Sequence, residues 1–174
     1  MFRLTDSPRL SEFERQVLPY LDAAYNLARF LMRNEQDAED VVQEASLRAF
    51  RFFENFRGEN SRAWFLKIVR NTAFTLLKKN RPDEMNVVFD EDLHTVRATA
   101  IDPGVEIDRA QGRQRARAAI EQLPPEFREA ITLRELEGAS YKEIADVAGV
   151  PIGTVMSRLA RARRQLQIIL SKSK

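Results

Sequence analysis

One stretch, GVPIGTVMSRLARARRQL at residues 149–166, combines several arginines with a complete lack of acidic residues. Guanidinium groups bind phosphates and the edges of guanine bases. The apolar residues in the same stretch recur at steps of four, three and four, which predicts a helix with one buried face. Those apolar residues are Val155, Leu159, Ala162 and Leu166. The opposite face is therefore expected to bind DNA, although a surface helix with solvated cations is the alternative.

The residues before this helix predict a helix-turn-helix. Ser140 followed by Glu143 forms a capping-box pattern for a first helix, Gly149 suits the turn, and Pro151 suits the start of the second helix. In such a unit the second helix enters the major groove. We predict that duplex DNA contacts the outer residues of this helix and those beside them, namely Thr154, Met156, Ser157, Arg158, Ala160, Arg161 and Arg164.

A second basic region lies between Phe56 and Arg81, where seven cations stand against the single acid Glu59. Part of it is expected to be a helix in which Lys67, Arg70, Asn71, Phe74 and Lys78 share an exposed face. This combination suits single-stranded nucleic acid. The cations can follow the phosphate backbone, the aromatic ring can stack on a base, and the amide can form hydrogen bonds with the edge of a base. The alternative, that Phe74 and Trp64 belong to the core, stays open at this point.

The helix expected from Asp37 carries a different surface. Opposite its apolar stripe lie Asp40, Gln43, Glu44 and Leu47, and carboxylates around an exposed leucine indicate protein docking, because they would repel DNA. A solvated face is the alternative. A metal site is not expected here, since the acidic residues do not converge on one helical side and His94, the only histidine, lies elsewhere. We predict no catalytic residue, no metal and no cofactor.

Charge and breaker residues divide the chain into three parts. Residues 1–81 carry 14 Lys/Arg and 11 Asp/Glu. Residues 82–110 carry 2 Lys/Arg and 8 Asp/Glu, and residues 111–174 carry 12 Lys/Arg and 7 Asp/Glu. The predicted organisation is a helical domain at 10–81, a loosely structured acidic linker at 82–110 and a helical domain at 111–174. Helix boundaries are expected near Asn34, in the break at 56–62, before Pro82 and at LPPEF (123–127).

Composition narrows the class further. With 6 glycines and 7 prolines among 174 residues, the chain has little material for the turns of an all-β fold, so we expect an all-α protein. The absence of cysteine excludes disulfides and thiolate metal sites. There is no apolar run of the length of a membrane span. We therefore expect a cytoplasmic protein.

Several motifs, in this order, resemble the extracytoplasmic-function (ECF) class of bacterial sigma factors. They are DAEDVVQEASLRAF (37–50), FRGENSRAW (56–64), KIVRNTA (67–73) and LPPEFREAITLRELEGASYKEIADVAGVPIGTVMSRLARAR (123–163). The resemblance implies a non-enzymatic subunit of RNA polymerase that serves transcription initiation in stress responses and is held by an anti-sigma factor.

The resemblance also assigns roles to the surfaces predicted above. Asp40, Gln43, Glu44 and Leu47 would dock on the clamp helices of the largest polymerase subunit. The loop after Phe56 and the helix bearing Asn71 would open the −10 promoter element and trap a flipped base. The carried-over residues are Phe56, Arg57, Trp64, Lys67, Arg70 and Asn71, with Phe74 and Lys78 on the same helical face. The helix from Pro151 would read the −35 element, and the acidic linker would thread the polymerase channel.

A different class of function remains open. A helix-turn-helix alone also suits an autonomous transcriptional regulator, which would bind duplex DNA as a dimer on half-sites about one helical turn apart. That alternative leaves the basic and aromatic face of residues 56–81 without a function.

Overall fold

The structure is a computed structural model that describes residues 7–85 and 109–173. All regular secondary structure in these two ranges is helical, as the composition predicts. In the first range the helices are α1 (Pro8–Val17), α2 (Leu21–Met32), α3 (Glu35–Phe52), α4 (Ser61–Asn80) and the single turn α5 (Pro82–Met85). In the second they are α6 (Arg109–Glu121), α7 (Pro125–Ile131), α8 (Tyr141–Ala148) and α9 (Ile152–Lys172).

Short polar side chains set where α3 and α4 begin. Asn34 accepts a 2.8 Å hydrogen bond from the backbone N–H of Asp37 and so caps α3, which starts two residues before the predicted Asp37. Asn60 caps α4 in the same way, accepting from Ala63 at 3.0 Å. The predicted break at 56–62 therefore ends at Asn60, whose side chain accepts a hydrogen bond from the first turn of α4. The helix α4 ends at Asn80, before Pro82 as predicted.

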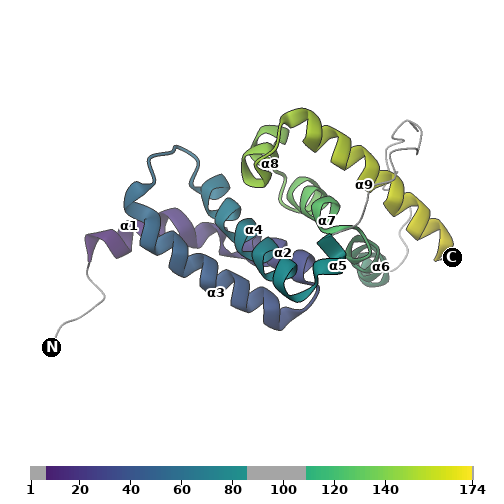
Figure 1. The fold of residues 1–174 in the computed structure, drawn as a ribbon, viewed down its shortest axis with the longest axis horizontal. Coiled ribbons are helices and arrows are strands. Elements are labelled where there is room, and N and C mark those ends of the chain that lie inside the picture. The colour runs from purple at the N-terminus through teal and green to yellow at the C-terminus, as the bar shows by residue number, and fades with distance from the viewer. Residues whose placement is uncertain (1–6, 86–108, 174) are drawn as a thin grey trace.

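The chain folds into two groups of helices that lie side by side (Figure 1). In the first group α2, α3 and α4 pack on one another, and in the second α7 and α8 pack against α9. The two groups also contact each other, α4 with α8 and α2 with α7. Buried apolar residues of both groups form one continuous cluster, which includes Leu27 and Phe65 on one side and Phe127 and Leu159 on the other.

The acidic linker was predicted to begin at Pro82 and to be loosely structured, whereas its first residues are helical. Residues 82–85 form α5, because proline fits the first turn of a helix and Glu84 binds arginines on neighbouring elements. At the other end, Arg109 and Ala110 already belong to α6. The remainder of the predicted linker, residues 86–108 with His94, lies outside the described residues.

Candidate nucleic-acid interface

The predicted docking surface lies on the outer side of α3. Asp40, Gln43, Glu44 and Leu47 are all exposed, and Leu47 retains 64% of its accessible surface. The inner side of the same helix is buried through Ala38, Val41, Ala45 and Ala49. Glu44 pairs with Arg48 one turn along the helix at 2.8 Å, and such an exposed pair contributes little stability. An apolar side chain surrounded by carboxylates is thus presented to solvent, as predicted.

The predicted strand-binding face of α4 is only partly exposed. Lys67, Asn71 and Lys78 are open to solvent. Arg70 is half-buried, because its Nε donates to the Glu129 carboxylate of α7 at 2.7 Å. The cations and the amide therefore share a face as predicted, but one of the cations is engaged by the other group of helices.

The prediction of an exposed aromatic ring at Phe74 was wrong. Phe74 is 9% exposed, and the guanidinium of Arg70 lies 3.9 Å from its ring centroid. Leu77 and Ala73 on the same side of α4 are fully buried. The ring therefore belongs to the core with a cation over its face, which decides the open alternative for this residue.

Two of the predicted strand-binding aromatic residues remain partly accessible, Phe56 in the loop before α4 and Trp64 in the first turn of α4. Phe56 and Trp64 are half-buried and lie 4.7 Å apart between ring centroids, and Phe53 packs beside both. The ring of Phe56 also covers Gly58, where a Cβ atom would come within 3.0 Å of it. Arg57 is exposed next to this cluster. Packing of the rings on one another fixes the loop while leaving part of Trp64 open.

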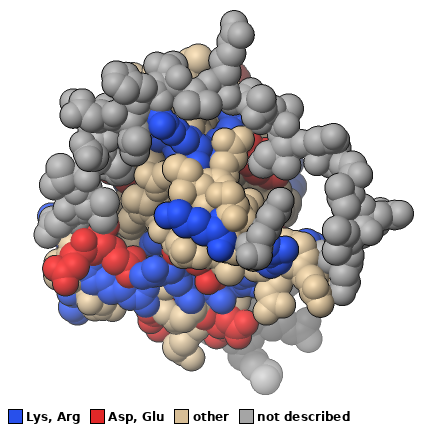
Figure 2. All heavy atoms as spheres, turned by 90° about the vertical axis from the view of Figure 1, so that its right-hand side faces the viewer, with Lys and Arg blue, Asp and Glu red and all other residues tan. Residues whose placement is uncertain are grey.

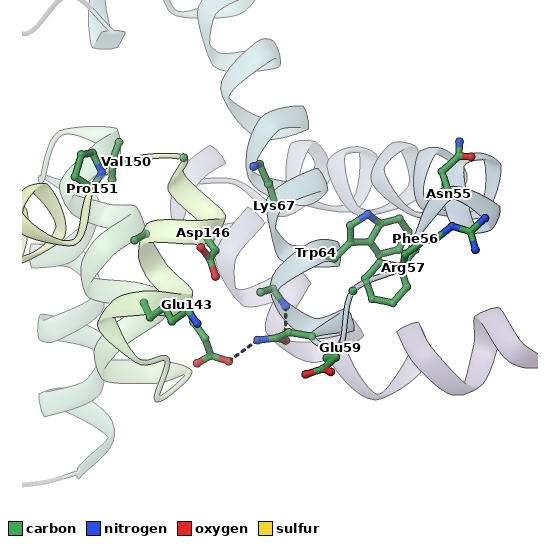
Figure 3. A pocket seen from close by; sticks show the side chains of 16 residues that line it. Asn55, Phe56, Arg57, Glu59, Trp64, Lys67, Glu143, Asp146, Val150 and Pro151 are labelled. Atoms are coloured by element: carbon green, nitrogen blue, oxygen red, sulfur yellow. Dashed lines mark hydrogen bonds between the residues drawn. The ribbon is translucent and has the colours of Figure 1, made fainter.

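These loop residues line an open cleft of about 920 Å³ between the two groups of helices. Figure 3 shows Phe56, Arg57, Trp64 and Lys67 on one side, with Glu143, Asp146, Val150 and Pro151 on the other. The Asn60 side chain donates a hydrogen bond to the Glu143 carboxylate at 3.2 Å and so joins the two sides of the cleft. Within the described residues, the loop that was predicted to bind a single strand therefore faces the first helix of the helix-turn-helix.

The helix-turn-helix forms as its sequence predicts. The Ser140 hydroxyl accepts from the backbone N–H of Glu143 at 3.1 Å, and the Glu143 carboxylate accepts from the backbone N–H of Ser140 at 2.9 Å. This backbone bond holds the pKa of Glu143 below its usual range. Gly149 ends α8 with a φ of 68°, a left-handed conformation that suits glycine. The second helix of the motif, α9, begins at Ile152, directly after Pro151.

The inner face of α9 is the predicted one. Val155, Leu159, Ala162 and Leu166 are buried against α7 and α8. Among the predicted DNA-contacting residues, Met156, Ser157, Ala160 and Arg161 are exposed, and Thr154, Arg158 and Arg164 are half-buried. The N-terminal turns of α9 thus present small side chains, with Arg161 exposed one turn after Ser157.

Two of the predicted arginines on α9 are more enclosed. The side chain of Arg158 is 16% exposed and lies 3.5 Å from the Glu126 carboxylate of α7. Arg164 is half-buried and makes contacts of its own. Arg163, which was not among the predicted contacts, pairs with Glu135 at 2.6 Å, and that bond raises its pKa. Arg161 is therefore the most exposed of the three arginines predicted to contact DNA.

Arg128 and Glu129, neither of which was predicted as a site residue, are each 1% exposed at the contact between the two groups. Arg128 donates to the carbonyl oxygens of Leu123 and Leu31 at 2.8 and 2.9 Å, and burial lowers its pKa to about 10. Burial also raises the pKa of Glu129, against the attraction of Arg70. The sequence gives no signal of this burial, because Arg128, Glu129 and Thr132 share one side of the helix and so look like an ordinary solvent-exposed polar face.

Other classes of site find no support within residues 7–85 and 109–173. No group of histidine and carboxylate side chains there is arranged to hold a metal ion. No helix in these ranges has the length and apolar character needed to span a membrane.

Comparisons with known proteins match both groups of helices. Residues 17–82 match the family described as Sigma-70 region 2, and residues 113–166 match the family described as Sigma-70, region 4. The chain is 36% identical to the RNA polymerase sigma-H factor of Pseudomonas aeruginosa, with 88% of this chain and 83% of that protein covered. It is also 36% identical to the ECF RNA polymerase sigma factor SigE of Mycolicibacterium smegmatis, with 96% of this chain covered but 65% of the relative's length.

A solved structure resembles the whole arrangement. The sigma factor RpoE from Bartonella quintana, in complex with the anti-sigma factor NepR, has a TM-score of 0.70 and 30% identity. The superposition covers 94% of this chain and 99% of RpoE.

Proposed function

Since this chain belongs to the ECF sigma factors of RNA polymerase, we propose that its separate surfaces bind the polymerase and two promoter elements. The supporting observation is that one chain presents three different surfaces. They are an exposed leucine beside carboxylates on α3, exposed cations on α4, and exposed uncharged residues at the N-terminus of α9. These surfaces differ in chemistry and lie on different helices, so each suits a different partner. The sigma factor acts without catalysing a reaction itself.

The polymerase-binding surface is the outer side of α3. Asp40, Gln43, Glu44 and Leu47 contact the clamp helices of the largest subunit, where the leucine supplies apolar contact and the carboxylates select a basic partner. Because RNA polymerase operates in the cytoplasm, the protein acts there. The docking residues and the DNA-binding residues lie on different helices, so binding polymerase leaves the DNA-binding surfaces free.

Residues 10–81 recognise and open the −10 element. Phe56, Arg57 and Trp64 hold the unstacked base, while Lys67, Asn71 and Lys78 contact the strand and Arg70 joins them when released by Glu129. Base–aromatic stacking is worth roughly 1–3 kcal/mol per base, which is of the order needed to unstack one nucleotide. Phe74 contributes from the core, since its ring supports the guanidinium of Arg70.

Residues 111–174 recognise the −35 element as duplex. The N-terminus of α9 enters the major groove, where small residues allow close approach and Arg161 reaches a base edge or a phosphate. Residues 82–110 connect the two functions. An anti-sigma factor, as bound to the related RpoE, covers these surfaces when transcription is not required.

Transcription with purified components tests this function. The chain is combined with core RNA polymerase and a pool of genomic fragments, retained fragments are sequenced, and unpaired thymines are mapped with permanganate. We expect transcripts that depend on both proteins and thymine reactivity near the start site. Core polymerase alone provides the control. If no retained fragment supports a transcript, or if the chain alone binds duplex DNA tightly as a dimer, an autonomous regulator is the better assignment.

A further inference from the structure

The first turns of α9 carry an exposed apolar stripe for which the proposed function gives no reason. Ile152 and Met156 retain 46% and 53% of their accessible surface, and Ala160 is also exposed. These residues stand at steps of four, so they lie side by side along one flank of the helix. The core-facing residues of the same helix are different ones, among them Val155 and Leu159. Packing inside the protein therefore does not account for the stripe.

The same turns lack the side chains that best distinguish guanine and adenine. Those bases are recognised by arginine, lysine, asparagine or glutamine, which bond two atoms of the base edge. The residues at 152–157 are IGTVMS, and none has a guanidinium, ammonium or amide side chain. Arg158 follows them, but its side chain is 16% exposed and lies beside Glu126. The turns that would enter the groove thus offer apolar surface and two hydroxyl groups.

The charge around the stripe favours base edges over a protein partner. The helix α9 contains no acidic residue, whereas the exposed Leu47 of α3 stands near Asp40 and Glu44. Figure 2 views the molecule from the side where α6 and the C-terminal end of α9 lie, and basic side chains form a band there bordered by acidic ones. The N-terminal turns of α9 have neither kind of charge, so they suit the floor of a groove rather than its phosphates.

The major groove of DNA offers one apolar group, the C5-methyl group of thymine. A methionine side chain is unbranched and flexible, so it can adapt its shape to such a group. Gly153 lies one turn before Met156 on the same side of the helix. In the part of the chain that the structure describes, no atom lies within 4 Å of the Cβ position that Gly153 lacks. A base edge can therefore approach closely beside the thioether of Met156.

We propose that Met156, with Ile152 beside it, selects thymine at one position of the −35 element by burying the C5-methyl group of the base. The methyl group and the apolar stripe leave water together, which favours thymine over the other bases at that position. Arg161 stays available for a phosphate or a guanine further along the helix. This selection rests on the proposed function, because it requires α9 to enter the major groove.

The experiment removes the methyl group alone. The chain is combined with core RNA polymerase, and the probe is a duplex that contains the −35 element retained by that complex. Each thymine of the element is replaced in turn by deoxyuridine, which lacks only the C5-methyl group. Affinity is measured for holoenzyme with the native chain, with Met156→Ala and with Ile168→Ala. Ile168 is 41% exposed near the other end of α9, so it is the matched control.

We expect deoxyuridine at one or two fixed positions to lower the affinity of the native holoenzyme about fourfold, the size expected for one methyl group in an apolar contact. Met156→Ala should remove this preference at one of these positions, and Ile168→Ala should keep it. A preference that disappears only when both partners of the contact are changed identifies a direct interaction. Both substituted side chains are exposed, and circular dichroism verifies that each variant is folded.

Equal affinity for thymine and deoxyuridine throughout the element would overturn the thymine selection and leave the proposed function intact. A methyl preference that Met156→Ala leaves unchanged would overturn it as well. If Met156→Ala instead weakens binding to core polymerase in the absence of DNA, the stripe is a protein-docking surface. A holoenzyme that retains no promoter fragment would contradict the proposed function itself, and the thymine selection with it.

Discussion

Arg70 of α4 donates to Glu129 of α7 at 2.7 Å, a bond that joins residues 59 positions apart across the contact between the two groups of helices. The arginine is one of the residues assigned to single-stranded DNA, and the carboxylate is almost completely buried. The cation that DNA would use is therefore neutralised inside the protein. Charge alone consequently overstates how much of the α4 face is available to a ligand in this structure.

The docking surface on α3 gives the first prediction. Reversal of its charge by Asp40→Lys with Glu44→Lys should weaken binding to core polymerase at least about tenfold, because like charges opposed across an interface cost several kcal/mol. Fluorescence anisotropy with labelled chain measures this affinity. The double variant Glu14→Lys with Asp22→Lys makes the same charge change at exposed positions of α1 and α2. If both double variants bind core polymerase as the native chain does, α3 is not the docking surface.

The arginines of α9 give the second prediction. Arg161→Ala should lower the affinity of the holoenzyme for −35 duplex by about 1–3 kcal/mol if the side chain reads a base, or reduce the salt slope by about one if it binds a phosphate. The thermal stability of the Arg161→Ala variant should stay near the native value, since the Arg161 side chain is exposed. Quantitative footprinting over a salt series distinguishes the two roles.

Arg158→Ala is the matched comparison. This side chain is mostly enclosed and lies beside Glu126, so its loss should lower Tm by about 2–4 °C, equivalent to about 1 kcal/mol in a chain of this length. Calorimetry measures the shift. The assignment of different roles is incorrect if Arg161→Ala lowers Tm as much as Arg158→Ala does.

The turn of the helix-turn-helix gives the third prediction. Gly149→Ala should destabilise the fold by about 1 kcal/mol, because alanine at a φ of 68° is strained. Gly153→Ala should stabilise it by about 0.5–1 kcal/mol, since this position lies in the first turn of α9 and nothing is near its missing Cβ. Urea unfolding measures both. Equal effects of the same sign would contradict the backbone argument.

The parts of this structure that the sequence predicts are those that depend on neighbours along the chain. The capping box of Ser140 and Glu143, the turn at Gly149 and the buried stripe of α9 all follow from residue types at fixed short spacings. Whether Phe74 is exposed depends instead on Arg70, whose position depends on a carboxylate in another helix. The same holds for α5, because its Glu84 binds Arg33 after the end of α2 and Arg128 of α7. Sequence periodicity contains no information about such contacts.

Protonation of Glu129 gives the fourth prediction. Burial raises its pKa in the folded state above the ordinary value of 4.5, so between these two values the folded chain binds more protons than the unfolded chain. The free energy of unfolding contributed by this residue must therefore fall as pH rises from about 4.5 through the raised pKa. Glu129→Gln lacks this ionisation and still offers an acceptor to Arg70, so its stability relative to the native chain should increase across that window.

Urea unfolding from about pH 4 to pH 7 measures the difference. Glu135→Gln, an exposed carboxylate paired with Arg163, serves as the control. A relative stability of Glu129→Gln that stays constant or decreases with pH would show that the attraction of Arg70 outweighs the cost of burial.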